Sequence, residues 1–267
     1  MKDKLSANEI LKYAKIKLNI NNLILLDTVN STNLYCKEFV KSNPCHELLV
    51  VADTQTKGRG RMDRAFFSPK NTGIYMSLLL DCRQLFLSPN LITIAAGVSV
   101  CRVLRNLCKT DAKIKWVNDI FAYRKKVCGI LAESVCTANK ISPQYIIVGI
   151  GINISTPDNV FPDELQSIAG SVFPNGISRN EIIANIISEL HYIYMKDSPK
   201  TLIDEYKEYS NILGKEITFL QNGKPYTGIA HDINNEGNLI VLLDNNEVIT
   251  LKSGEVSLGS AEFTKKV

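Results

Sequence analysis

The sequence predicts an α+β protein in two parts, a larger mixed region followed by a small all-β domain. From about residue 23 to 213, segments with apolar residues at helical spacing are interspersed with short apolar runs typical of buried strands. Beyond Gly214 only short strand-like segments remain, separated by turns that carry Asn222-Gly223 and Glu236-Gly237. The 267 residues suffice for one full domain and a small second one, so we place the boundary near Leu213.

Helices and strands follow one another in the first half of the chain. A short helix should form in an N-terminal stub, residues 1–22. The next helix is expected to begin at Ser31 or Thr32, because either side chain can accept a hydrogen bond from a backbone N–H group of the first turn. The predicted elements are a helix at 7–18, a strand at 23–26, a helix ending at Val40, strands at 48–52 and 73–80, and a long buried helix at 91–108.

Four more strand-like segments follow, and a basic turn joins two of them. Arg124-Lys125-Lys126 lies between two apolar segments and predicts a hairpin. Ser178 and Glu181 have the spacing of a capping box, which opens a second long helix. The strands are expected at 114–117, 120–123, 127–135 and 144–154, a third helix at 202–209, and the strands of the C-terminal domain (214–267) at 216–220, 226–233, 239–243 and 248–251.

Composition and charge exclude several classes of protein. A net charge of +4 is too mild to favour general nucleic-acid binding. The apolar runs are far shorter than the roughly 20 residues that span a bilayer, and residues 1–10 lack the apolar stretch of a signal peptide, so we expect a cytoplasmic protein. The seven cysteines form no C-x-x-C pair and the three histidines lie far apart, which argues against disulfides and against a metal site made by the protein alone.

The segment most specific for chemistry is the basic loop at 53–64. Gly58 and Gly60 let the backbone approach a ligand closely, and Arg59 and Arg61 carry permanent charge that matches phosphate or carboxylate oxygens. Such a loop can also close over a ligand and exclude water. Its spacing is neither that of a P-loop nor that of a dinucleotide-binding loop. Taken alone, these residues leave a flexible basic surface turn as an equal alternative.

Later segments place polar residues and glycines inside apolar strands. Asn118 and Asp119 need hydrogen-bond partners, so they either form a turn, which is the default, or contact a ligand. Lys126 lies upstream of Gly129, and a glycine inside a strand often marks close approach by another group. The run Gly149-Ile150-Gly151-Ile152-Asn153 suggests a second face for a flat ligand, although plain packing explains it equally well.

Together these segments resemble one family. Their order and spacing are similar to those of biotin protein ligases from about Leu23 to Leu258, and the segment Ser253-Gly254-Glu255-Val256-Ser257 resembles the last domain of that family. The motifs that carry the resemblance are Ser31-Thr32-Asn33, Gln55, Gly58-Arg59-Gly60-Arg61, Lys115-Trp116-x-Asn118-Asp119, Lys126-x-x-Gly129-Ile130-Leu131 and Gly149-x-Gly151-x-Asn153.

The resemblance implies a fold, a reaction and its substrates. The fold is a mixed β-sheet flanked by helices, of the class II synthetase type, with a small SH3-like β-barrel at the C-terminus. In the first step biotin and MgATP give biotinyl-5′-adenylate and pyrophosphate. In the second, a lysine of a biotin carboxyl carrier protein attacks the mixed anhydride. Dimers through a sheet edge occur in the family, so a homodimer stays open.

The family's site residues carry over to the matching positions. The resemblance assigns catalysis to Lys126, Arg61 and Asp119, since activating a carboxylate brings two anions together and requires cationic groups to neutralise them. Asp119 could orient the phosphates, the metal or the incoming lysine. The implied biotin contacts are Ser31, Thr32, Asn33, Gln55, Gly58, Arg59, Gly60, Arg61, Lys126 and Gly129, and the implied ATP contacts are Arg61, Arg64, Phe66, Lys115, Asn118 and Asn153.

Three departures from the family pattern set further expectations. Met62-Asp63-Arg64-Ala65-Phe66 stands where the family has x-Gly-Arg-x-Trp, so the loop should be stiffer and less positive, with Phe66 stacking on adenine in place of the tryptophan. Val117 replaces the proline of the Lys-Trp-Pro-Asn-Asp motif. About 22 residues precede the first strand, too few for a winged helix-turn-helix of roughly 60 residues, so no DNA binding and no repressor role are expected.

Three other functions compete with this interpretation. A lipoate protein ligase shares the adenylate chemistry, but the Gly-Arg-Gly-Arg loop and the C-terminal domain favour biotin. A non-catalytic biotin or nucleotide sensor would not need Lys126, Arg61 and Asp119 together. A basic nucleic-acid-binding protein is disfavoured by the mild net charge.

Overall fold

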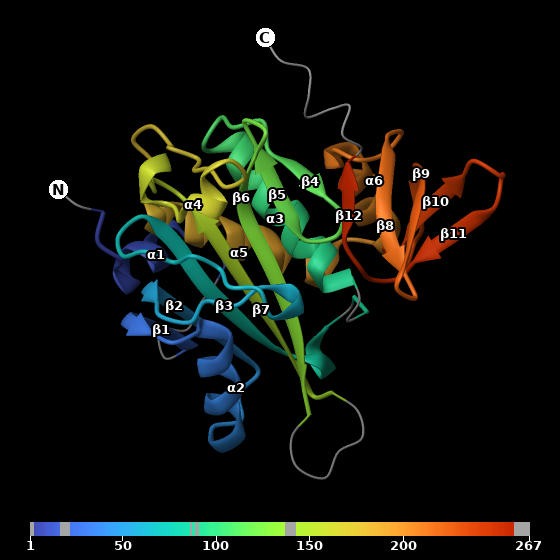
Figure 1. The fold of residues 1–267 in the computed structure, drawn as a ribbon. Coiled ribbons are helices and arrows are strands. Elements are labelled where there is room, and N and C mark those ends of the chain that lie inside the picture. The colour runs from blue at the N-terminus through green and yellow to red at the C-terminus, as the bar shows by residue number, and fades with distance from the viewer. Residues whose placement is uncertain (1–2, 17–21, 86, 89–90, 137–142, 259–267) are drawn as a thin grey trace.

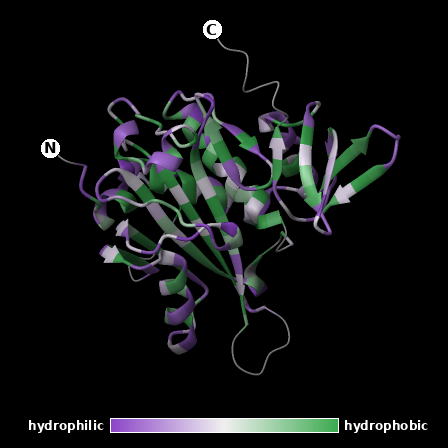
Figure 2. Cartoon of the chain, viewed as in Figure 1, coloured by the Kyte–Doolittle hydropathy of each residue, from purple (hydrophilic) through white to green (hydrophobic). Residues whose placement is uncertain are grey.

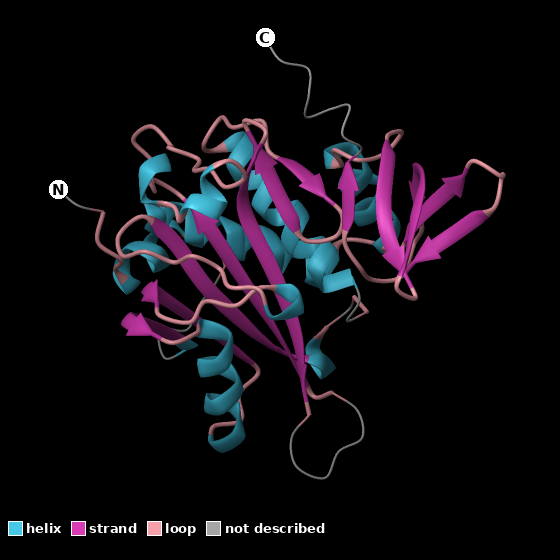
Figure 3. Cartoon of the chain, in the orientation of Figure 1, coloured by secondary structure: helices cyan, strands magenta, loops and turns pink. Residues whose placement is uncertain are grey.

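The computed structural model describes residues 3–16, 22–85, 87–88, 91–136 and 143–258. A large twisted sheet carries helices on both faces, and a smaller group of strands lies beside it (Figure 1, Figure 3). This arrangement confirms the predicted α+β class with a C-terminal β domain. Within the described ranges, no helix is long and apolar enough to cross a membrane.

The large sheet has seven strands and is mixed. Its order is β1 (Leu23–Val29), β2 (Glu47–Gln55), β3 (Gly73–Asp81), β7 (Tyr145–Asn153), β6 (Lys125–Val135), β5 (Asp119–Ala122) and β4 (Lys113–Lys115). β1 and β2 are parallel, and the other neighbouring pairs are antiparallel. The mixed sheet is the one that the family resemblance implies.

The helices divide the hydrophobic core into two parts. They are α1 (Ala7–Tyr13), α2 (Thr32–Ser42), α3 (Ile92–Asn106), α4 (Asp163–Gln166), α5 (Arg179–Lys196) and α6 (Pro199–Tyr209). α3 and α5 pack on one face and α2 packs on the other, over strands that are largely hydrophobic (Figure 2). Side chains alternate along β2, so Leu49 and Val51 join the larger core whereas Leu48 and Val50 lie under α2.

The C-terminal domain is an antiparallel sheet of five strands. Their order is β11 (Val248–Leu251), β10 (Leu239–Leu243), β9 (Lys224–Ile233), β8 (Glu216–Gln221) and β12 (Val256–Leu258). Trp116, just after β4, donates its Nε1–H to the carbonyl of Gly237 in the β9–β10 turn at 3.0 Å. Lys207 on α6 forms an ion pair with Asp232 on β9. These contacts fix the smaller sheet beside the end of β4.

The expected strands differ from the structure mainly at two turns. The strand expected at 114–117 ends at Lys115, because residues 116–118 form the turn into β5. The Trp116–Val117 peptide bond is cis. The basic hairpin turn consists of Tyr123 and Arg124, both at positive φ, so Lys126 lies within β6 itself. Lys126 therefore has the fixed direction of a strand residue.

The expected starts of α2 and α5 are confirmed, whereas α1 and α3 are shorter than expected and α6 begins earlier, at Pro199. Ser31 caps α2, and Ser178 caps α5 by accepting a hydrogen bond from the backbone N–H of Glu181. α1 ends at Tyr13, and the last two residues of the helix expected at 7–18 lie outside the described ranges. The sequence does not predict α4 or β12 as separate elements, since each is too short to show a period.

Candidate active site

The site lies on the α2 face of the large sheet, beside the N-terminus of α2. The apolar core under α2 includes Leu79 and Ile147, which are paired across β3 and β7. The next two cross-strand rows on this face are Ser77–Gly149–Leu131 and Tyr75–Gly151–Gly129. Side chains on one face of a strand recur at every second position. The apolar rows are therefore followed by two rows in which one serine and three glycines stand beside Leu131 and Tyr75. Their small side chains leave room above the sheet.

A cluster of hydrogen-bonded polar side chains, the Thr32–Gln55 cluster, lies where α2 begins. Ser31 accepts a hydrogen bond from the backbone of Leu34. The backbone N–H and the hydroxyl of Thr32 lie 2.9 and 3.1 Å from Oε1 of Gln55, and the N–H donates to it. Gln55 Nε2 donates to Ser68 Oγ at 3.0 Å. The structure thus brings together Ser31, Thr32 and Gln55, which the sequence places on the biotin side.

Protein groups engage both ends of the Asn33 carboxamide. Its Nδ2 donates to Glu133 Oε2 at 2.7 Å and to the carbonyl of Leu131 at 3.3 Å. Its Oδ1 accepts from Ser77 Oγ at 2.6 Å. A Cβ atom at Gly149 would lie 2.2 Å from Asn33 Oδ1. The first glycine of the Gly149–Gly151 pair therefore makes room for Asn33.

This close approach gives a stability prediction. Gly149→Ala should destabilise the protein by about 1–3 kcal/mol, because the added methyl group overpacks a filled site. Gly97→Ala on α3 is the matched control, since its Cβ would meet Ile114 Cδ1 at an ordinary 3.5 Å. Helix propensity predicts a gain of about 0.5–1 kcal/mol for that control. Thermal unfolding measures both, and an unchanged Tm for Gly149→Ala would contradict the packing described.

The loop at 58–66 is a small closed hairpin. The N–H of Phe66 donates to the carbonyl of Gly58 at 2.9 Å, and the N–H of Gly60 donates to that of Arg64 at 2.7 Å. Met62 and Asp63 at its tip have φ of 52° and 56°. Asp63 stands where the family has glycine, and aspartate is among the side chains that tolerate this left-handed region. The tip of the loop is exposed, whereas its end at Phe66 lies against the sheet.

The ring of Phe66 lies on the two opposed glycines of the sheet. A Cβ at Gly151 would be 2.6 Å from Phe66 Cε1, and one at Gly129 would be 3.3 Å from Phe66 Cε2. Phe66 also meets Tyr75 edge-on, with ring centroids 6.4 Å apart. The flat face suggested by the glycines thus exists, and here it carries the aromatic ring of the loop. The stacking of Phe66 on adenine stays a prediction.

Charged groups converge at the edge of the sheet beside this platform. Lys126 Nζ lies 2.7 Å from Asp119 Oδ1, an ion pair without the angles of a directed hydrogen bond. Lys115 is paired with Asp119 across β4 and β5, and burial lowers the pKa of its ammonium group while Asp119 opposes that change. Arg61 Nη1 donates to Asn118 Oδ1 at 3.1 Å. The loop therefore reaches the residue next to Asp119.

Asn153 and Arg64 lie at the margins of this charged group. Asn153 donates from Nδ2 to the carbonyl of Gly170 at 3.0 Å, while its buried Oδ1 has no hydrogen-bond partner within the described ranges. That oxygen can accept a hydrogen bond from a ligand. Arg64 Nη2 donates to Glu255 at 2.6 Å, so the loop contacts the C-terminal domain. Both partners are largely exposed, and this ion pair adds little stability.

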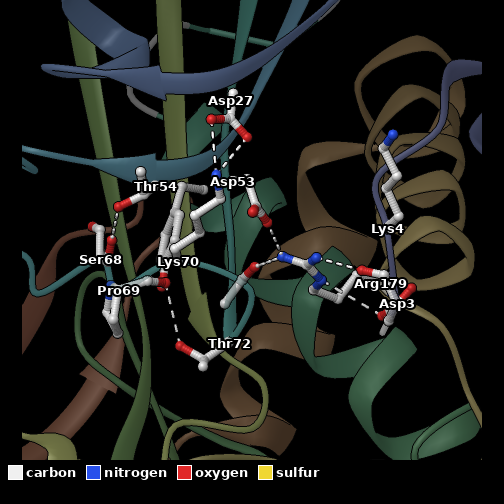
Figure 4. A network of polar contacts seen from close by, with 12 residues as sticks. Asp3, Lys4, Asp27, Asp53, Thr54, Ser68, Pro69, Lys70, Thr72 and Arg179 are labelled. Atoms are coloured by element: carbon white, nitrogen blue, oxygen red, sulfur yellow. Dashed lines mark hydrogen bonds and ion pairs between the residues drawn. The ribbon is translucent and has the colours of Figure 1, made fainter. Parts of the chain in front are cut away.

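A buried arginine behind the site ties several segments together (Figure 4). Arg179 opens α5 and is 1% exposed. Its Nη1 donates to Asp53 Oδ1 at 2.7 Å and to the carbonyl of Gly73 at 3.0 Å. Its backbone N–H donates to the carboxylate of Asp3 at 2.6 Å. Because Asp53 lies two residues before Gln55, the network fixes the end of β2 that carries Gln55.

The sequence does not identify Ser77, Glu133, Ser68 or Arg179 as site residues. A weak signal exists for the first two, since each is a polar residue in an apolar strand. For the described residues, no group of three His, Cys, Asp or Glu side chains has the arrangement of a metal site.

Comparison with known proteins identifies the family. Residues 25–153 match the biotin/lipoate A/B protein ligase family, and residues 212–259 match the biotin protein ligase C terminal domain. The bifunctional ligase/repressor BirA of Bacillus subtilis is 32% identical over 263 residues, which cover 96% of this chain and 80% of that protein. The chain belongs to the biotin protein ligase family.

Other proteins of similar sequence or structure are also biotin ligases. The biotin–[acetyl-CoA-carboxylase] ligase of Mycobacterium tuberculosis is 26% identical over 220 residues, 78% of each chain. The biotin protein ligase from Aquifex aeolicus, solved in complex with biotin and ATP, is similar with a TM-score of 0.71 and 28% identity. That match covers 89% of this chain and 98% of the other. The predicted family and the predicted enzyme class, a ligase, are both confirmed.

Proposed function

We propose that the ligase activates biotin with MgATP to biotinyl-5′-adenylate and transfers the biotinyl group to a lysine of a biotin carboxyl carrier protein. The observation that carries this proposal is the placement of Lys126 and Arg61 at one end of the Gly129–Gly151 platform, with the Thr32–Gln55 cluster near its other end. The neutral polar head of biotin would bind at this cluster, and the carboxylate of biotin would lie toward Lys126 and Arg61.

The first step joins two anions, so the cations must act where their charges meet. The biotin carboxylate attacks the α-phosphorus of ATP, an oxygen–phosphorus bond forms, and pyrophosphate leaves with the electron pair of the broken bond. Lys126 and Arg61 would offset the negative charge that gathers between the reactants. Mg²⁺ enters with ATP as part of the substrate. Asn153 Oδ1 offers an acceptor for the nucleotide.

The second step transfers the acyl group. The uncharged amine of the carrier lysine attacks the carbonyl carbon of the adenylate and forms the amide bond. The bond between that carbon and the phosphate oxygen breaks, AMP leaves with its electron pair, and the amine loses one proton to solvent. Asp119 is our candidate for orienting the incoming lysine, because its carboxylate lies beside Lys126 at the platform edge. The loop at 58–66 would shield the adenylate from water between the two steps.

Pyrophosphate release tests the proposal against the lipoate alternative. The purified chain with MgATP should release pyrophosphate when biotin is added and none above background when lipoate replaces it. Pyrophosphate release with lipoate and none with biotin would contradict the proposal. Omission of either ATP or biotin is the control for contaminating hydrolysis.

Several finer expectations stay predictions. We expect a biotin carboxyl carrier protein to be the biotin acceptor, and we expect neither DNA binding nor a repressor role. We also expect a cytoplasmic location, and a homodimer is one oligomeric state that stays open. We also keep the domain boundary near Leu213 as a proposal, with residues 23–213 as the catalytic part and 214–267 as the C-terminal part.

A further inference from the structure

Two side chains outside the predicted site complete a hydrogen-bond array that ends at Thr32. We propose that Ser77 and Glu133 are positioning residues that turn the Thr32 hydroxyl into a hydrogen-bond acceptor for an N–H group of the substrate head. This inference rests on the proposed function, and it explains why the site would select a substrate with a cyclic urea.

The array is oriented from Glu133 on β6. A carboxylate oxygen carries no hydrogen, so the contact of 2.7 Å requires Asn33 to present Nδ2 to Glu133. The second Nδ2 hydrogen points to the carbonyl of Leu131 at 3.3 Å. Both hydrogens of the carboxamide are thereby used. Asn33 Oδ1 must then face Ser77, and the amide cannot be reversed without losing these contacts.

Ser77 passes this orientation on to Thr32. Ser77 is fully buried, and its Oγ lies 2.6 Å from Asn33 Oδ1 and 2.7 Å from Thr32 Oγ1. Asn33 Oδ1 can only accept, so the single hydroxyl hydrogen of Ser77 is committed there. Because Ser77 has no second hydrogen for its contact with Thr32, the hydrogen of the Thr32 hydroxyl is directed either to Ser77 Oγ or to Gln55 Oε1.

Gln55 closes the array from the other side. Its Oε1 accepts from the backbone N–H of Thr32, and its Nε2 donates to Ser68 Oγ, which in turn donates to the carbonyl of Phe66 at 2.9 Å. The Thr32 hydrogen therefore points into the protein, toward Ser77 Oγ or toward Gln55 Oε1 at 3.1 Å. The oxygen of the Thr32 hydroxyl therefore presents a lone pair to a ligand and acts as an acceptor.

A hydrogen-bond acceptor at Thr32 favours a substrate whose head group carries an N–H donor. A cyclic urea carries two N–H donors, whereas a dithiolane ring carries none. A buried hydroxyl that finds no donor on the ligand loses a hydrogen bond, so a head group without N–H binds poorly. Without Ser77 or Glu133, the Thr32 hydrogen keeps only the longer contact of 3.1 Å to Gln55 Oε1. It is then held inward less firmly, and the selection weakens.

Four variants test the inference. Ser77→Ala and Glu133→Ala should each raise the Kd for biotin, measured by calorimetry without ATP, by about 10-fold or more. Their KM for ATP should stay within about 2-fold of wild type, because the effect is confined to one substrate. Glu133→Gln should restore the Kd to within about 3-fold, since a carboxamide oxygen can accept from Asn33. Ser134→Ala, at the exposed neighbour of Glu133, should change nothing.

The outcomes separate the possible failures. Unchanged biotin affinity in both alanine variants overturns the inference and leaves the proposed function intact. So does a lowered Tm with equal changes in the KM of both substrates and no rescue by Glu133→Gln, because that pattern is purely structural. If Ser77→Ala fails to fold, the Glu133→Ala and Glu133→Gln pair decides. Absence of biotin binding in the wild type overturns the proposed function, and this inference with it.

Discussion

Lys126→Ala should slow pyrophosphate release at least about 100-fold, equivalent to roughly 2.7 kcal/mol of lost transition-state stabilisation. Lys126 lies in β6, where the strand fixes its direction, and its ammonium group sits 2.7 Å from Asp119 at the edge of the glycine platform. Removing it takes away the cation and also leaves the Asp119 carboxylate without its counter-charge. Steady-state kinetics with saturating biotin and MgATP measure the effect.

Lys125→Ala is the matched control for that experiment. Lys125 is the neighbour of Lys126 on the same strand, but its ammonium group pairs with Asp158 at 2.8 Å. We expect its rate to stay close to that of the wild type. Near-normal pyrophosphate release by Lys126→Ala would reduce Lys126 to a structural lysine of the hairpin. Thermal unfolding of both variants separates a loss of rate from a loss of fold.

Arg179→Met should lower the stability of the protein by about 3–5 kcal/mol, the usual cost of removing one partner of a buried ion pair. Methionine fills most of the volume, but it leaves the carboxylate of Asp53 and the carbonyl of Gly73 without their donor. For a chain of this length, the loss corresponds to a drop in Tm of roughly 10 °C.

The surface ion pair between Lys70 and Asp27 provides the control for Arg179 (Figure 4). Lys70→Met removes a charge of the same sign from the same region. Because exposed ion pairs contribute little, its Tm should stay near that of the wild type. A Tm for Arg179→Met equal to that of Lys70→Met would show that the buried network is not needed for the fold.

The sequence predicts strand bounds well where turn residues set off a short strand-like segment on both sides. β10 and β11 have the bounds that the short segments 239–243 and 248–251, each set off by turn residues, predict. The turn after β4 is different, because the apolar residues at 116–117 continue the strand pattern although the chain reverses there. Local pattern cannot reveal a turn that is stabilised by distant groups, here the carbonyl of Gly237 bound to Trp116.

The candidate site shows the same division between local motifs and distant contacts. Thr32, Gln55 and Lys126 belong to motifs that can be recognised in order along the chain. Ser77 acquires its role only when Asn33, 44 positions away, is placed over it by α2. Arg179 follows a helix cap and would be read as a solvent-exposed residue of the first turn, yet its partner Asp53 lies 126 positions away.

Phe66 illustrates a further limit. The family resemblance predicts that its ring stacks on adenine, and the structure adds that the ring lies on Gly129 and Gly151. The direction of a loop side chain depends on how the hairpin at 58–66 closes, and the motif does not encode that geometry.

The most direct test of the central claim is to look for the reaction intermediate itself. The wild-type chain is incubated with biotin and MgATP, freed of small molecules by rapid gel filtration, denatured and analysed by mass spectrometry. We predict that biotinyl-5′-adenylate elutes with the protein in near-stoichiometric amount and disappears, with the release of AMP, when a biotin carboxyl carrier domain is added. Absence of the adenylate together with absence of pyrophosphate would contradict the proposed function.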